Sequence, residues 1–99
     1  MKTNIEKMKR KMMAVLRRHD VVKAAIFGSY ARGDAKKGSD LDLLVQFVRG
    51  KSLLDLAGLQ IALEESLKMK VDVLTYNSLH PLLKDRILNE QEVFYEERP

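Results

Sequence analysis

The chain has 99 residues, of which 45% are hydrophobic, and its formal net charge at pH 7 is +4. This length fits one small domain, so we expect residues 1–99 to form a single unit. Cysteine is absent, which excludes disulfides and thiolate metal sites. We recognise no signal peptide and no apolar run near the ~20 residues that span a bilayer, and therefore expect a soluble, cytoplasmic protein without membrane association.

Helical and strand patterns alternate along the chain. Apolar residues recur at helical spacing in some segments, whereas short β-branched runs indicate strands. In chain order the sequence predicts a helix over 4–18, a strand over 21–27, a short helix over 29–32, a strand over 40–47, a helix from 52 to about 69, a strand over 71–75, a helix capped by Asn77 or Ser78, and an edge strand over 93–95. This order predicts an α/β (α+β) fold, with a small mixed β-sheet and flanking helices.

Two aspartates stand where the second strand should begin. Asp40 and Asp42 are two residues apart, so a strand would project them from one face, ~7 Å apart along the backbone. Two such charges repel each other and raise the pKa of one carboxyl unless a cation lies between them. Because carboxylate oxygens suit Mg²⁺, the pair predicts a divalent metal site.

A third carboxylate, Asp72, interrupts the apolar strand over 71–75. If that strand neighbours the strand of Asp42, Asp72 can join the pair. Three carboxylates on adjacent strands can hold two metal ions ~3.5–4 Å apart, an arrangement used for in-line phosphoryl transfer.

Gly28 and Ser29 stand where the first strand gives way to a short helix. Glycine lets the backbone approach a phosphate, and the serine hydroxyl adds a hydrogen-bond donor. The pair predicts a phosphate-binding turn, although it is not a Walker loop, because no G-x-x-x-x-G-K-[ST] occurs.

Each of these residues also has a purely structural interpretation, which the residues taken singly leave open. These interpretations are a turn cap for Asp40, a solvated strand position for Asp42, an ion pair with Lys70 or Arg86 for Asp72, and a surface ion pair for Arg32.

The stretch GSYARGDAKKGSDLDLLV, residues 28–45, resembles the signature of the minimal nucleotidyltransferases in the DNA polymerase beta-like superfamily. That signature joins Gly-Ser, Ala-Arg-Gly and Ser-Asp-x-Asp-Leu to a third acidic residue on a later strand. The resemblance covers nearly the whole chain, because the minimal domain of the family is about this size. The matching positions are Gly28, Ser29, Ala31, Arg32, Gly33, Ser39, Asp40, Asp42 and Leu43, with Asp72 as the third acidic residue.

The resemblance implies a nucleotidyltransferase fold and a nucleotidyl transfer that uses two Mg²⁺ ions, with ATP as the nucleotide donor. Asp40 and Asp42 would bind Mg²⁺, and Asp72 would help to hold the metal that activates the acceptor hydroxyl. These three aspartates are the expected catalytic and metal-binding residues.

The same resemblance implies the nucleotide-binding residues. Gly28 and Ser29 would hold the terminal phosphates of the nucleotide, and Arg32 would contact phosphate or brace the loop. Ser39 completes this set as part of the matching motif. The loop that carries Lys36 and Lys37 lies outside the signature, but it is close enough to touch substrate.

The family also suggests a partner. It includes partners of HEPN-type toxins in prokaryotic toxin–antitoxin pairs, some of which transfer AMP from ATP to a toxin tyrosine. Larger relatives carry an extra acceptor-binding domain, for which this chain has no room. We therefore expect a macromolecular acceptor, most plausibly a HEPN-domain protein, and both homo- and hetero-oligomers are compatible with the sequence.

Two other functions compete with this one. The first is an antitoxin-like subunit of weak activity that inhibits its partner by direct binding, but contact alone would not need Asp72. The second is a nucleic-acid binder that uses its basic first helix. It is the weakest, because that segment lacks interleaved aromatic residues for base stacking, and a solvated helix face explains the charges.

Overall fold

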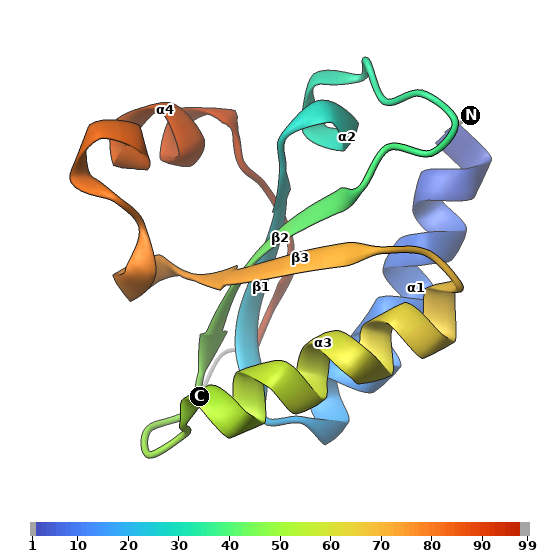
Figure 1. The fold of residues 1–99 in the computed structure, drawn as a ribbon. Coiled ribbons are helices and arrows are strands. Elements are labelled where there is room, and N and C mark those ends of the chain that lie inside the picture. The colour runs from blue at the N-terminus through green and yellow to red at the C-terminus, as the bar shows by residue number, and fades with distance from the viewer. Residues whose placement is uncertain (1, 98–99) are drawn as a thin grey trace.

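A four-stranded mixed β-sheet organises the fold (Figure 1). The structure is a computed structural model that describes residues 2–97, with side chains from residue 5 onward. The strand order is β3-β2-β1-β4. β1 (Val21–Phe27) pairs antiparallel with β2 (Leu41–Phe47) and β4 (Glu92–Glu96), whereas β3 (Val71–Thr75) runs parallel to β2. The predicted mixed sheet is confirmed.

Two helices cover one face of this sheet. α1 (Lys2–Arg18) and α3 (Leu53–Leu67) contact each other and bury apolar side chains against the strands. Side chains alternate between the two faces of β2, and one set of them enters this core. The fully buried members are Met12 and Leu16 of α1, Val21 and Ala24 of β1, Leu41, Leu43 and Val45 of β2, Leu59 and Leu63 of α3, and Val71 of β3.

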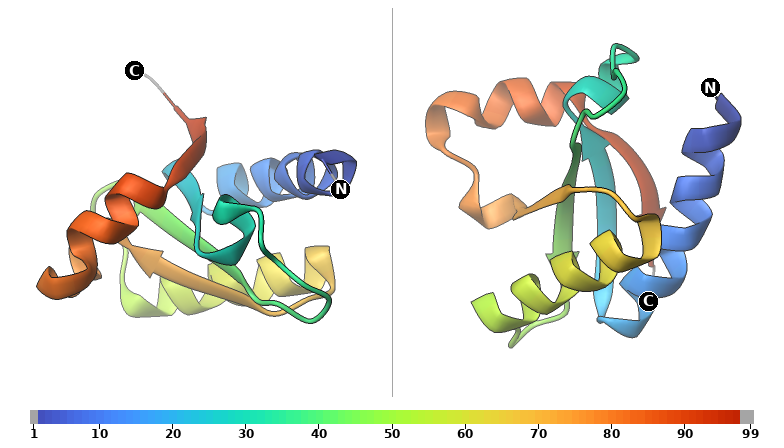
Figure 2. Two further views of the ribbon diagram at one scale, coloured as in Figure 1. Left: turned by 90° about the horizontal axis from the view of Figure 1, so that it is seen from above. Right: turned by 45° about the vertical axis from the view of Figure 1, so that its right-hand side comes forward.

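The opposite face carries a smaller cluster, in which Ala25, Phe27 and Leu44 pack with Leu79. The 3₁₀ helix η1 (Tyr76–Ser78) and α4 (Pro81–Glu90) lie over this side, away from α1 and α3 (Figure 2). No residue of α4 is fully buried. One side of α4 is therefore available to line a cleft rather than a core.

The start of α4 differs from the prediction. Asn77 and Ser78 belong to η1, and the N-cap is His80, whose Nδ1 accepts a hydrogen bond of 3.1 Å from the backbone N–H of Leu82. Pro81 explains the position, because proline suits the first helical residue and keeps the residue before it extended. The predicted cap at Asn77 or Ser78 was wrong.

The remaining element boundaries lie close to the predicted ones. β2 begins at Leu41, so Asp40 is the last residue of the preceding loop. α3 ends at Leu67 because Lys68 adopts a left-handed conformation with φ of 56°.

Within residues 2–97, no helix is long and apolar enough to cross a membrane.

Candidate active site

A cleft of about 540 Å³ lies where the C-terminal end of β1 meets the N-terminal ends of β2 and β3. One side of α4 forms its wall. The residues that line it include every site residue predicted from the sequence, namely Gly28, Ser29, Arg32, Ser39, Asp40, Asp42 and Asp72, together with Leu83, Arg86, Ile87 and Glu90 of α4.

The acidic residues gather on one side of this cleft. Asp42 is the register partner of Asp72 on the parallel strand β3, and Asp40 immediately precedes β2. Burial raises the pKa of Asp42, and the negative charges of Asp72 and Asp40 raise it further. Asp42 is thus half-buried among like charges, which argues against a merely solvated strand position.

Asp72, the third carboxylate, forms no ion pair with any side chain that the structure describes. Neither Lys70 nor Arg86 forms an ion pair with Asp72 in the described part of the chain. Within residues 2–97, however, no three acidic or histidine side chains are already close enough together to hold a metal ion. The protein alone therefore offers a partial set of oxygen ligands and not a closed cage.

Position 28 requires a glycine for two reasons, its backbone conformation and the space that the side chain of Asp42 occupies. The φ of 76° and ψ of −152° of Gly28 lie in a region that is essentially confined to glycine. A Cβ at this position would clash with the carboxylate of Asp42. The absence of a side chain at Gly28 therefore leaves space for the half-buried carboxylate of Asp42.

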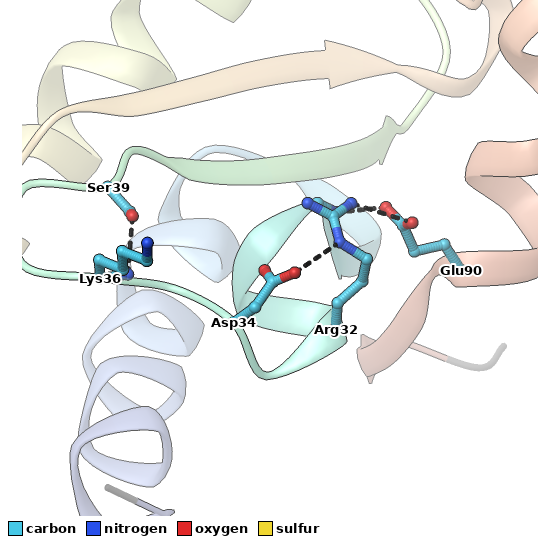
Figure 3. Close-up of polar contacts among 6 residues, drawn as sticks. Arg32, Asp34, Lys36, Ser39 and Glu90 are labelled. Atoms are coloured by element: carbon cyan, nitrogen blue, oxygen red, sulfur yellow. Dashed lines mark hydrogen bonds and ion pairs between the residues drawn. The ribbon is translucent and has the colours of Figure 1, made fainter.

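Glu90 links the Gly28 turn to α4, and Figure 3 shows its carboxylate beside Arg32. Its Oε1 accepts a hydrogen bond of 2.7 Å from the backbone N–H of Gly28, and its Oε2 accepts one of 3.1 Å from Arg32. Arg32 also donates from Nε to Asp34, at 3.2 Å. Burial alone would raise the pKa of Glu90, but the bonds from Gly28 and Arg32 outweigh it and lower the pKa. Arg32 is therefore held between two carboxylates.

Ser39 closes the loop that leads into β2. Its Oγ accepts a hydrogen bond of 2.8 Å from the backbone N–H of Lys36, and its own N–H donates to the carbonyl of Lys36 at 2.9 Å (Figure 3). Because Asp40 follows directly, this turn fixes the point at which the acidic pair enters the cleft.

With this geometry established, the comparison with known proteins is decisive. Residues 8–93 match the nucleotidyltransferase domain family. The chain belongs to this family. It is 62% identical over 87 residues to MJ0435, a candidate protein adenylyltransferase of Methanocaldococcus jannaschii, covering 88% of this chain and 94% of that protein.

Solved structures agree with this membership. A candidate minimal nucleotidyltransferase is 40% identical, with a TM-score of 0.78 over 89% of this chain and 90% of that chain. A chain in the complex of a tri-AMPylated Shewanella oneidensis HEPN toxin with MNT antitoxin shares the fold at 18% identity, with a TM-score of 0.73, covering 92% of this chain and 71% of that one. The chain is a nucleotidyltransferase.

Sequence reasoning missed one residue of this nucleotidyltransferase site, Glu90. No role was predicted for Glu90 from the sequence. A usable signal was nevertheless present, because Leu83, Ile87 and Glu90 stand at the i, i+4 and i+7 positions of one helix face. A carboxylate that continues an inward-facing apolar stripe should be examined as a site residue.

Proposed function

We propose that this nucleotidyltransferase transfers AMP from ATP to a hydroxyl of a HEPN-type protein. The observation that carries the proposal is the single cleft in which Gly28 and Ser29 meet Asp40, Asp42 and Asp72. The protein adenylyltransferase name of the 62% identical relative supports AMP as the transferred group. The tri-AMPylated HEPN toxin in the complex with the same fold supports the acceptor.

The three aspartates are the proposed ligands of Mg²⁺. Their oxygen atoms suit a hard divalent cation. Burial and the negative charges of Asp72 and Asp40 raise the pKa of Asp42, and a bound cation would offset both effects. Mg²⁺ is usually held by one or two carboxylates together with substrate phosphates, so an incomplete protein cage fits this ion. When bound, the metal would supply neutralising charge for the triphosphate and for the acceptor oxygen.

The chain's own residues would then position the substrates. Ser29, at the cleft side of the Gly28 turn, would donate its hydroxyl to a phosphate. Ser39 would support nucleotide binding through the turn that it closes before Asp40. Asp72 is exposed on the edge strand β3, so a macromolecular hydroxyl can approach it from solvent.

The test is a transfer assay with a purified HEPN-type protein encoded beside this chain. With ATP labelled at the α-phosphate and Mg²⁺, the wild type should place label on the partner, whereas label at the γ-phosphate should not transfer. Asp42→Asn should lose the adduct and still bind the partner. Asp85→Asn, which removes an exposed carboxylate of α4 that does not line the cleft, is the matched control and should retain transfer.

An assay without transfer of label would favour the second candidate function, inhibition by direct contact. If the wild type makes no adduct and Asp42→Asn still neutralises the partner, direct-contact inhibition replaces transfer as the function.

A further inference from the structure

The cleft holds two arginines in different electrostatic surroundings. Arg32 is bound by Asp34 at 3.2 Å and by Glu90 at 3.1 Å. Arg86, on α4, lines the same cleft and is exposed, and it has no ion pair among residues 2–97. One guanidinium is therefore committed to the protein, and the other is available to a ligand.

The helix places Arg86 on the cleft side. Leu83, Arg86, Ile87 and Glu90 all line the cleft and follow the i, i+3, i+4, i+7 spacing of a single helix face. The charge of Arg86 reaches Glu90 and contributes to lowering its pKa. Both oxygens of Glu90 are nevertheless already engaged, by the N–H of Gly28 and by Arg32.

This arrangement decides which groups a triphosphate can use. A phosphate that took the N–H of Gly28 or the guanidinium of Arg32 would leave Glu90 without its hydrogen bonds, close to the added negative charge. A part-buried carboxylate that loses its partners pays a desolvation penalty. A phosphate bound by Arg86 breaks no side-chain hydrogen bond or ion pair among the described residues, and Arg86 would offset the negative charge of the aspartates that line the same cleft.

We propose that Arg86 is the arginine that contacts the triphosphate, while Arg32 and Glu90 act as a clamp that holds the Gly28 turn in position. This assignment rests on the proposed function, because it takes ATP as the ligand. The sequence left two roles open for Arg32, phosphate contact or bracing of the loop. The proposal gives the first role to Arg86 and the second to Arg32.

The experiment is titration calorimetry of ATP and of AMP, with Mg²⁺, against the intact chain. Arg86→Gln should weaken ATP binding at least about tenfold, as expected for a lost bond to a charged group, and should weaken AMP binding less. The melting temperature of this variant should stay at the wild-type value, because Arg86 forms no ion pair within the described part of the chain. Arg32→Gln should instead lower the melting temperature, because it opens the clamp.

Lys84→Gln is the matched control, because it removes the same charge from an exposed position of α4 that does not line the cleft. It should bind ATP as the wild type does. If Arg86→Gln also binds ATP as tightly as the wild type, or if Lys84→Gln loses as much affinity, the assignment of Arg86 is wrong although the proposed function stands. A wild type that binds no ATP would overturn both proposals together.

Discussion

Asp42 lies beside Asp72 on the neighbouring parallel strand, and the two carboxylates share one end of the sheet. Burial raises the pKa of Asp42 above its ordinary value of 3.8, and Asp72 and Asp40 add to the shift. At pH values between that ordinary value and the raised folded-state pKa, the folded chain therefore holds a proton that the unfolded chain has released. Folding stability conferred by this proton is lost as the pH rises through the folded-state pKa.

Asp42→Asn should consequently stabilise the protein when metal and nucleotide are absent. The variant removes a half-buried negative charge but keeps the shape of the side chain. Thermal denaturation should show a higher melting temperature than that of the wild type at pH 7, and the difference should shrink as the pH falls through the raised folded-state pKa of Asp42, because the side chain then becomes protonated. A variant that is less stable than the wild type at pH 7 would contradict this account of the cleft.

Divalent metal should instead make the wild type more stable than the Asp42→Asn variant. If Asp40, Asp42 and Asp72 bind Mg²⁺ or Mn²⁺, the metal stabilises the folded wild type through mass action, by about 2.7 kcal/mol at a hundredfold excess over Kd. The double variant Asp40→Asn, Asp42→Asn should lose this gain, and EDTA should abolish it in the wild type. Calorimetry that detects no divalent binding at millimolar Mg²⁺, even with ATP present, would rule out the metal site.

Gly28→Ala should be strongly destabilising, by at least about 3 kcal/mol, because it combines a forbidden backbone conformation with a clash against Asp42. Gly33→Ala is the matched control, since Gly33 also has a positive φ, of 82°, but has open space around the added methyl group. It should cost about 1 kcal/mol. Chemical denaturation measures both values.

Adding Asp42→Ala to Gly28→Ala separates the clash from the strain. The double variant should recover part of the lost stability, because the alanine removes the carboxylate that meets the new Cβ. Strictly additive losses would show that strain at Gly28 alone explains the effect.

His80→Ala should lower stability by about 1 kcal/mol, because the N–H of Leu82 loses its capping acceptor at the start of α4. His80→Asn should restore most of that loss, since asparagine is a good N-cap residue. Chemical denaturation at pH 7 measures both. Equal stability of the alanine variant and the wild type would show that Pro81 alone sets the start of α4.

The sequence predicted what depends on local pattern. β1 and β3 have the expected bounds, and β2 places Asp42 on the face opposite Leu41, Leu43 and Val45, as the alternation of a strand requires. The sequence offered the adjacency of β2 and β3 only as a condition, and the register of Asp42 with Asp72 confirms it. The structure adds that the two strands are parallel. The catalytic and binding roles of these residues remain predictions.

The sequence could not predict contacts between distant segments. Glu90 meets Gly28 across 62 positions and Arg32 across 58, and no local propensity encodes such a meeting. It depends on how α4 lies across the sheet, which is fixed by the packing of Leu79 and Ile87 on Phe27 and its neighbours. The cap at His80 was missed for a more local reason, because Pro81 outweighed the better capping residues before it.

The hydrogen bond between Glu90 and Gly28 can form only late in the synthesis of the chain. The Gly28 turn leaves the ribosome 62 residues before Glu90, an interval of about 3–12 s at ordinary elongation rates. Until α4 has been made and has docked, the turn lacks the carboxylate that holds it. The nucleotide site of a nascent chain would therefore be incomplete. The proposed transfer from ATP would begin only after the segment that carries α4 has left the ribosome.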